Sequence, residues 1–335
     1  MAKMQAVEAF DRTMQDIIRV ALPFSGKIMV LGGDFRQVLP VVRHGTRAHI
    51  VDYILWMSPL WPTIKKIRLT FNIRAHTDPW FSEFLLRIVD GDEEAVDESF
   101  IRIPDDMTIP YTDKGKSKDA LIDAIFPSLQ INGADSDYII SRAILSTKNE
   151  NVDEINDQLI DKFSRDEKNI LQQYSLDEAE DDKNNIYPMD FLNSLTVGRL
   201  PPNYLRLKIG CPIILLPSNG LCNSSVLICR CPIILLPSNP LCLFEDNVFS
   251  IKLKRKQFPI RLSFSMTINK AQGQTNLNVG VYLPKSVFSH GQLYVALSRG
   301  ISRGNIKVLV KYVKKNYRVE VYTSNVGYQE VLRDE

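Results

Sequence analysis

The 335-residue sequence has no long hydrophobic run and few cysteines, and each scarcity excludes a class of protein. No apolar stretch reaches the roughly 18 residues that a membrane-spanning helix needs, so we expect no membrane segment and no membrane partner. The opening residues, MAKMQAVEAFDR, lack the apolar core of a secretory signal, which predicts an intracellular protein. Five cysteines, an odd number, favour free thiols over a disulfide framework.

The composition is that of a globular chain, but its charges are unevenly distributed. Hydrophobic residues make up 44% and charged residues 24%, and at about 150 residues per domain the length predicts two domains. The net charge is +2, yet residues 251–318 hold fourteen Lys and Arg and no Asp or Glu. Such a stretch favours a polyanionic partner such as nucleic acid, with a solvated basic face as the alternative. Acidic blocks at residues 90–106 and 150–182 are typical of solvated faces or mobile loops.

Hydrophobic spacing predicts helices that alternate with buried strands. Helical periodicity covers residues 4–20, 80–89, 152–163 and 289–298. Apolar runs predict strands at residues 27–31, 138–145, 279–283 and 306–312, and alternation predicts a half-exposed strand at residues 260–267. Residues 91–135 are typical of an irregular acidic connection, and residues 205–243 of a small β subdomain. The alternation predicts an α/β protein with mostly parallel sheets.

One internal repeat lies within the predicted β subdomain. Residues 211–222 (CPIILLPSNGLC) recur at residues 231–242 (CPIILLPSNPLC) with eleven of twelve positions identical. Two copies are too few for a solenoid, so the repeat indicates a local duplication or an error in the gene model. The cysteine spacing matches no common zinc site, and we predict no metal site there.

The segment GGDFRQVLPVV, residues 32–42, directly follows the strand predicted at residues 27–31. A glycine pair at the carboxyl end of a parallel strand is typical of the edge where ligands bind in open α/β sheets. Asp34, Arg36 and Gln37 place an acid, a cation and an amide at that edge. A glutamine in this place can orient a water or contact a phosphate in nucleotide hydrolases, whereas a β-turn with solvated polar groups is the alternative.

Two arginines end the segments LTFNIRA (residues 69–75) and HGQLYVALSRG (residues 290–300). Arg299 is expected to project from the end of a helix, where it could stabilise charge on a transferring phosphoryl group. The alternative is a favourable interaction with the helix dipole. Arg74, considered alone, is typical of a surface residue. His290 is expected to be a packed or capping residue rather than a catalytic base.

The segment SMTINKAQGQT, residues 265–275, gathers hydroxyl, amide and cationic groups behind a strand. Thr267 is expected to cap a helix. The polar side chains are those of Thr267, Asn269, Lys270, Gln272, Gln274 and Thr275, and Gly273 divides them. Such groups at the start of a helix suit contact with a phosphate backbone.

A Gly-Lys-Ser sequence at residues 115–117 resembles the end of a phosphate-binding loop, but we reject it. The loop requires a first glycine at position 110, where the sequence has Pro110. No buried strand is predicted before it.

Taken in order, the four motifs resemble the later motifs of superfamily-one 5′–3′ DNA helicases of the Pif/RecD type. The resemblance is strongest to the Pif-like helicase part of Helitron transposon proteins. GGDFRQVLPVV resembles the third helicase motif, LTFNIRA the fourth, FSMTINKAQGQT the fifth and GQLYVALSR the sixth. Residues 144–156 (ILSTKNENVDEIN) and 207–216 (LKIGCPIILL) also resemble that family.

The resemblance implies RecA-like parallel sheets of the P-loop NTPase type, with a small SH3-like β insertion in the second of two domains. The implied parts are a remnant of the first RecA-like domain at 1–75, an acidic irregular connection at 76–135, the second RecA-like domain at 136–190 and 258–318, the β insertion at 191–257, and a C-terminal tail at 319–335. ATP would lie in the cleft between the two domains, and Mg²⁺ would accompany it.

The resemblance also assigns roles to individual residues. Gln37 would contact the γ-phosphate, Arg74 and Arg299 would be cationic clamps with Arg299 as the arginine finger, and Gly33 and Asp34 would adjoin the nucleotide. The DNA-binding residues would be Thr267, Asn269, Lys270, Gln272 and Gly273. The implied partners are single-stranded DNA or DNA junctions, and the implied location is the nucleus.

The family's Gly-Lys-Thr loop and its Asp-Glu pair, which hold the triphosphate and Mg²⁺, are absent from these 335 residues. We therefore expect an ATP-dependent DNA helicase by descent, linked to DNA repair, recombination, telomere maintenance or Helitron transposition, in a truncated form that is inactive alone. The alternatives are a non-catalytic nucleic-acid-binding remnant of a transposon helicase and a remnant that does not fold stably. The sequence predicts no oligomeric state.

Overall fold

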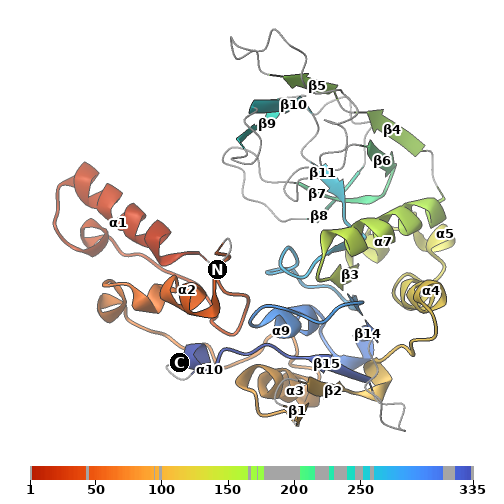
Figure 1. Cartoon of the computed structure of the whole chain (residues 1–335), viewed down its shortest axis with the longest axis horizontal. Coiled ribbons are helices and arrows are strands. Elements are labelled where there is room, and N and C mark those ends of the chain that lie inside the picture. Colours follow the sequence, from red (N-terminus) through yellow and green to blue (C-terminus); the bar gives the residue numbers. More distant parts are fainter. Residues whose placement is uncertain are drawn as a thin grey trace. The chain divides into compact units, whose positions relative to one another are not determined.

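The computed structural model describes most of the chain. The described residues are 2–42, 45–93, 95–97, 100–164, 167–171, 173–176, 204–215, 226–229, 240–245, 252–256, 260–311 and 321–332. They divide into two compact units (Figure 1). The first unit comprises residues 1–108, 284–304 and 310–335, and the second comprises residues 109–283 and 305–309. The domain boundaries predicted from the sequence stay a prediction. No helix among these residues is long and apolar enough to cross a membrane.

A four-stranded sheet forms the centre of the second unit. Its strands lie in the order β12 (Ser265–Thr267), β3 (Arg142–Ser146), β13 (Asn278–Leu283) and β14 (Ile306–Val310). Both β12 and β13 run parallel to β3, which confirms the predicted α/β class. Because parallel strands end at the same edge, the residues that follow β3 and β12 lie at one edge of the sheet.

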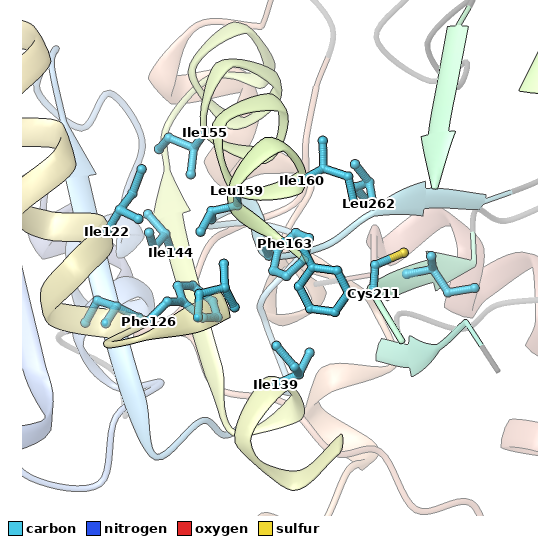
Figure 2. Close-up of a cluster of buried hydrophobic side chains, with 14 of the residues drawn as sticks. Ile122, Phe126, Ile139, Ile144, Ile155, Leu159, Ile160, Phe163, Cys211 and Leu262 are labelled. Atoms are coloured by element: carbon cyan, nitrogen blue, oxygen red, sulfur yellow. The ribbon is translucent and has the colours of Figure 1, made fainter. Parts of the chain in front are cut away.

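Helices cover this sheet through a shared apolar cluster. They are α4 (Lys114–Ile125), α5 (Leu129–Asn132), α6 (Ser136–Ile140) and α7 (Asn149–Lys162). Figure 2 shows Ile122 of α4, Ile144 of β3 and Leu159 of α7 directed into one buried cluster. Each of these three side chains is fully buried, and full burial of such a side chain contributes about 1.5–3 kcal/mol to folding.

Short antiparallel strands form the remainder of the second unit. Strands β11 (Ile260–Leu262), β7 (Pro212–Leu215) and β8 (Val226–Ile228) form one sheet in that order. The other sheets pair β4 (Glu167–Leu171) with β6 (Tyr204–Lys208), and join β5 (Gln173–Leu176), β10 (Lys252–Lys256) and β9 (Pro240–Glu245). A β subdomain is therefore confirmed where residues are described. Most of the duplication, residues 216–222 and 231–239, lies outside the described residues.

The first unit combines helices with a small antiparallel sheet. Its helices are α1 (Met4–Ile18), α2 (Arg47–Asp52), α3 (Pro79–Asp90), α9 (Gln292–Leu297) and α10 (Gln329–Leu332). Its short 3₁₀ turns lie at Pro23–Gly26, Leu55–Met57, Trp61–Thr63, Asp105–Met107 and Arg303–Asn305. Strand β2 (Phe100–Ile103) lies between β1 (Ala95–Asp97) and β15 (Val321–Ser324), so the predicted C-terminal tail contributes a strand beside a segment from much earlier in the chain (Figure 1).

Helix α3 shows how local sequence sets the bounds of an element. The carboxylate of Asp78 accepts a hydrogen bond from the backbone N–H of Phe81 at 3.0 Å, which caps the first turn. The helix ends at Gly91, whose φ of 82° few other residues adopt without strain. Between these ends Phe81, Phe84 and Ile88 form a buried face, and α3 packs against α9.

The strand predicted at residues 27–31 does not form. In the described part of the chain no strand pairs with this segment, and its apolar side chains are exposed: Ile28 by 94% and Val30 by 89%. A buried strand of the parallel type needs hydrogen-bonded neighbours on both sides and helices on both faces. The apolar run alone supplies neither, so the segment stays extended and unpaired.

Two further predictions on elements are wrong in part. Residues 91–135 are not wholly irregular, because the Asp113 carboxylate caps α4 through a 2.9 Å hydrogen bond from the Lys116 N–H. The strand predicted at residues 138–145 begins only at Arg142, since Asp135 caps the short helix α6 in front of it. In both places a capping aspartate marks a helix that the apolar pattern alone does not reveal.

The half-exposed strand predicted at residues 260–267 is instead two buried strands. Its first part, β11, pairs with β7, and its second part, β12, pairs with β3. Arg261 and Ser265 on the supposedly exposed face are buried, like the apolar residues between them. Period-2 alternation shows which residues share a face, but not whether a second layer covers the polar face.

Candidate functional site

A tight loop after the extended segment at residues 27–31 carries the first candidate residues. The Asp34 carboxylate accepts a hydrogen bond from the Arg36 N–H at 2.9 Å and another from the Gln37 side-chain amide at 3.1 Å. Arg36 also pairs with Asp90 at 3.2 Å. Gly33 leaves open space beside this loop, since a Cβ there would meet no atom within 4 Å. The loop thus presents an acid and an amide next to an unobstructed backbone.

Both candidate arginines contact the C-terminal end of α9. Arg299 donates from Nε to the Val295 carbonyl at 2.9 Å and from Nη2 to the Ser298 hydroxyl at 2.8 Å. Arg74 donates from Nη1 to the Ser298 carbonyl at 2.7 Å. Cations are favoured at a helix C-terminus, where carbonyl groups lack partners within the helix. Arg299 therefore folds back over its helix and is only 2% exposed, whereas the sequence led us to expect that it projects.

Tyr294 of α9 lies at the centre of these charges. Burial raises the pKa of its hydroxyl, Asp34 raises it further, and Arg36, Arg299 and Arg74 oppose that shift. Burial, assisted by repulsion from Arg74, lowers the pKa of Arg299 to about 10. Even so, Arg299 keeps its charge at neutral pH. The structure thus brings Asp34, Arg74 and Arg299 around one tyrosine, and Gln37 joins them through Asp34.

His290 and Gly291 attach the Asp34 loop to the start of α9. His290 Nε2 lies 2.8 Å from the Phe35 carbonyl, and the Tyr328 N–H donates to His290 Nδ1 at 2.8 Å. The ring is therefore neutral with its proton on Nε2, and burial lowers its pKa. Its role as a packed residue is confirmed. Gly291 has a φ of 66°, and a Cβ there would lie 2.3 Å from the Arg36 carbonyl oxygen.

The candidate DNA-binding residues all lie in the second unit, in a turn after β12. Thr267 ends the strand, and its carbonyl accepts hydrogen bonds from the N–H groups of Lys270 and Ala271. No regular helix follows, so Thr267 starts consecutive turns rather than the expected helix. Asn269 and Gly273 are exposed, while Lys270 and Gln272 are half-buried. All five candidate residues therefore belong to one turn at one edge of the sheet.

Buried polar contacts hold this turn against α7. Asn156 of α7 donates to the carbonyls of Leu262 and Ser265 at 3.3 and 3.0 Å and accepts from the Ser265 N–H at 2.8 Å. Arg261, which is buried, forms an ion pair with Asp153 of the same helix. Burial, assisted by repulsion from Arg261, lowers the pKa of Lys270. The charge pattern alone does not reveal these supports, because one partner of each contact lies more than 100 residues away in the sequence.

The residues present fit one side of a polyphosphate but not a complete magnesium–nucleotide site. Two guanidinium groups and a glutamine amide are groups that bind phosphate oxygens. Among the described residues no three acidic, histidine or cysteine side chains gather to hold a metal ion. The Gly-Lys-Ser sequence lies in the first turn of α4, whose end is already capped by the Asp113 carboxylate. An anion there would meet a like charge, so its rejection as a phosphate loop agrees with the structure.

Two family models match this chain. Residues 1–99 match the model described as PIF1-like helicase, and residues 190–230 match that of the DNA helicase Pif1 2B domain. These two segments of the chain are similar to the Pif1-type helicases. The first match contains the Asp34 loop and Arg74, and the second overlaps the β subdomain, so the resemblance to Pif1-type helicases is confirmed. The Helitron assignment and the truncation stay predictions.

Relatives with assigned activities match over short segments. The ATP-dependent DNA helicase PIF1 of Candida albicans is 46% identical over 65 residues, which are 19% of this chain and 7% of that protein. The ATP-dependent DNA helicase Pif1 of Campylobacter jejuni is 35% identical over 82 residues, 24% of this chain and 17% of that protein. The matched segments thus span far less than two thirds of these relatives' length.

Solved structures extend the likeness to nearly the whole chain. The crystal structure of Pif1 helicase from Candida albicans aligns with a TM-score of 0.64 at 21% identity, over 99% of this chain and 72% of that one. Bacteroides Pif1 bound to ssDNA aligns with a TM-score of 0.59 at 19% identity, over 92% of this chain and 68% of that one. At these identities the likeness shows the fold, which is RecA-like.

Proposed function

We propose that this Pif1-like chain provides the arginine-bearing part of an ATP-dependent 5′–3′ DNA helicase motor. One observation carries the proposal: Asp34, Gln37, Arg74 and Arg299 come from three separate segments and gather around α9. A surface arginine or an ordinary β-turn would not require that convergence. The PIF1-like family match over residues 1–99 supports the same proposal.

In this proposal the two arginines face the outer phosphates of ATP. When bound, ATP would supply the γ-phosphoryl group, whose negative charge spreads during transfer. Arg299 and Arg74 are positioned by backbone acceptors on α9, so their charges need little rearrangement to stabilise that charge. The side-chain amide of Gln37 donates to the Asp34 carboxylate. In the nucleotide site Gln37 would contact the γ-phosphate or orient a water. Gly33 lets the bound group approach the backbone closely.

The second unit would contact DNA through residues 267–273. Thr267, Asn269, Lys270 and Gln272 offer hydroxyl, amide and cationic groups that suit a phosphate backbone, and Gly273 leaves space beside them. Related Pif1 helicases have been solved with ssDNA and at forked dsDNA. Single-stranded DNA or a junction is therefore the proposed partner. The proposed biological setting is DNA repair, recombination and telomere maintenance, or Helitron transposition, in the nucleus.

A second candidate function is nucleic-acid binding without catalysis. The observation that favours it is the absence of a G-x-x-x-x-G-K-[ST] loop from all 335 residues, while residues 251–318 retain fourteen cations and no acid. On either reading the chain binds DNA. Only the helicase reading predicts that the Arg299 site acts on a nucleotide.

The DNA-binding part of both proposals is tested by a filter-binding titration of single-stranded DNA at two salt concentrations. Lys270→Ala is expected to weaken binding and to reduce the slope of log Kd against log salt by about 1. Lys285→Ala is the matched control, because Lys285 is an exposed lysine of the same basic stretch outside the turn. Binding with no salt dependence, or an equal loss in both variants, would contradict the assignment.

A mixing experiment distinguishes the helicase proposal from the binding proposal, because it supplies the phosphate-binding loop that these 335 residues lack. The chain is mixed with a polypeptide that carries a Pif1-type Gly-Lys-Thr loop and Asp-Glu pair, and DNA-stimulated ATP hydrolysis is measured. The helicase reading predicts hydrolysis that Arg299→Ala abolishes and Arg303→Ala, at an exposed arginine nearby, leaves unchanged. DNA binding without hydrolysis in any mixture would favour the non-catalytic reading.

A further inference from the structure

Two cysteines face each other across the ends of β7 and β8. Pro212 pairs with Ile228 in the antiparallel register, so the next residue outward on each strand places Cys211 opposite Cys229. The Cys229 N–H donates to the Cys211 carbonyl at 3.0 Å, and the Gly210 N–H donates to the Cys229 carbonyl at 2.8 Å. The backbone on both sides of the cysteine pair is thereby fixed by hydrogen bonds.

The two thiols are close enough to be linked with little backbone movement. Neither cysteine forms a disulfide in the structure, and the Cys211 thiol hydrogen-bonds to the Cys229 sulfur. Directly opposed residues of an antiparallel pair have Cα atoms about 4.5–5.5 Å apart, which lies within the about 4.4–6.8 Å that disulfides span. The register therefore already supplies the geometry of a cross-strand disulfide.

The surroundings of the two cysteines differ. Figure 2 shows Cys211 next to Phe163 in the buried apolar cluster, and it has no exposed surface. Cys229 is also buried, but it keeps 6% of its surface exposed. The hydrogen bond from Cys211 lowers the pKa of Cys229 to about 7, while the same bond and burial raise the pKa of Cys211. Cys229 is thus the sulfur that becomes a thiolate near neutral pH, and thiolates are the nucleophilic form.

We propose that Cys211 and Cys229 form a reversible dithiol–disulfide site that responds to hydroperoxides and covalently links β7 to β8. This role is independent of the proposed helicase function. It rests on the register, the thiol–thiol hydrogen bond and the small difference in exposure between the two residues. The odd cysteine count of the sequence predicts free thiols, and the reduced state of this pair agrees with that prediction.

The chemistry has two balanced steps. The Cys229 thiolate attacks one oxygen of hydrogen peroxide, the O–O bond breaks, hydroxide leaves, and Cys229 becomes a sulfenic acid. The Cys211 sulfur then attacks the Cys229 sulfur, the S–O bond breaks, and the departing hydroxyl takes the Cys211 proton to form water. Both sulfurs lose one electron and the two peroxide oxygens gain them. An external thiol reverses the link by exchange.

The duplication supplies internal competitors for this assignment. Cys222, Cys231 and Cys242 belong to the two copies of the repeat, and Cys231 follows Cys229 after a single residue. Five cysteines allow ten different pairings. The proposal names one of these ten pairings, Cys211 with Cys229, so any other main pairing would contradict it.

The test is to treat the reduced 335-residue chain with a few equivalents of hydrogen peroxide, alkylate the remaining thiols and map disulfides by mass spectrometry. Chymotrypsin is needed, because no Lys or Arg lies between Cys211 and Cys229. We expect a Cys211–Cys229 link as the main product, its removal by dithiothreitol, and a higher midpoint of thermal unfolding for the oxidised chain. Cys231→Ser, the matched control, should leave the link intact.

Two variants test the order of the steps. In Cys211→Ser, Cys229 should accumulate as a sulfenic acid that dimedone traps, because the second sulfur is missing. In Cys229→Ser, Cys211 should stay a thiol under the same treatment, since it is buried. A main product that joins Cys222, Cys231 or Cys242, alkylation of both cysteines after peroxide in the unmodified chain, or dimedone labelling of Cys211 would each overturn the proposal.

Discussion

His290 shows how a single side chain can join segments that are far apart in the sequence. Its ring donates to the carbonyl of Phe35 and accepts from the N–H of Tyr328, so it links the Asp34 loop to the residues before α10. Both bonds are partly buried, and together they require the neutral ring with its proton on Nε2. A histidine before GQLYVALSR therefore sets the position of the candidate loop without touching a ligand.

The first prediction concerns removal of this ring. His290→Ala is expected to lower the free energy of unfolding by about 2–4 kcal/mol, because two partly buried hydrogen bonds and the packing of the buried ring are lost. Urea unfolding followed by circular dichroism measures the change. His76→Ala, at an exposed histidine, is the matched control and should change little. If His290→Ala lowered the free energy of unfolding no more than His76→Ala does, the linking role of His290 would be contradicted.

The same histidine predicts a dependence of stability on pH. Burial lowers the pKa of folded His290 below its usual 6.5, Phe35, Glu330 and Asp34 oppose the shift, and Arg47 adds to it. The unfolded chain then binds more protons at acidic pH, so the free energy of unfolding should fall as pH drops below about 6.5. Urea titrations at pH 7.5 and pH 5.5 should show a larger loss in the unmodified chain than in His290→Ala. Equal losses would contradict the assignment.

Gly273 and Gly291 both have a positive φ, so the same substitution at each tests close packing. Gly291→Ala would place a Cβ 2.3 Å from the Arg36 carbonyl oxygen, whereas a Cβ on Gly273 meets nothing within 4 Å although its φ is 87°. Gly273→Ala should therefore cost only the backbone strain of about 1–2 kcal/mol. Gly291→Ala should cost clearly more and should disturb the Asp34 loop. Equal losses in urea unfolding would mean that the loop does not pack on Gly291.

At the scale of elements, α7 and β12 depend on each other through Asn156. The side chain makes three buried hydrogen bonds to the backbone at residues 262–265, just before the turn with the candidate DNA residues. Asn156→Ala is expected to lower the free energy of unfolding by about 2–4 kcal/mol, because it leaves buried backbone groups unsatisfied. Glu150→Ala, at an exposed residue of the same helix, is the matched control.

The consequence for the turn is measured separately. Hydrogen exchange at residues 265–275 should become faster in Asn156→Ala than in Glu150→Ala, since the turn loses its support. Unchanged exchange there would contradict the supporting role of Asn156, whatever the effect on global stability.

The sequence predicts elements best where the pattern depends on local contacts. The helices α1, α3, α7 and α9 and the strands β3, β13 and β14 all overlap their predicted ranges. Except in α1, where Asp11 is the buried residue, their apolar spacing or apolar runs reflect the face or core they bury. The motifs also identified Asp34, Gln37, Arg74 and Arg299 as candidates before their proximity was known. Their roles stay predictions.

Long-range contacts explain what the sequence could not predict. Arg261 is buried because Asp153 of α7 pairs with it, and the alternation around it cannot reveal that partner. The positions of Tyr294 and His290 depend likewise on residues more than 30 positions away.

At the scale of the whole molecule, the first unit exposes an unusual number of large apolar side chains. Ile28, Val30, Ile67, Leu69 and Phe71 are each at least 73% exposed, and they lie in two extended segments without assigned strand structure. Soluble monomers seldom expose large contiguous apolar patches. Both segments also end next to candidate site residues, at Asp34 and at Arg74.

These segments predict self-association of the purified chain. Ile28→Lys together with Leu69→Lys should reduce concentration-dependent association in sedimentation velocity without lowering the free energy of unfolding, because neither side chain is buried. Ile131→Lys, at an exposed isoleucine of the second unit, is the control and should leave association unchanged. Association that persists in the double variant would show that other surfaces cause it.

The central claim is that the two arginines and the glutamine belong to a nucleotide site whose phosphate loop these 335 residues do not contain. The most direct measurement is steady-state ATP hydrolysis by the purified chain with saturating single-stranded DNA and Mg²⁺. We predict no DNA-stimulated hydrolysis, because loss of even one group that stabilises the transition state costs about 10²–10³ in rate. Turnover by the chain alone that Arg299→Ala abolishes would contradict the claim.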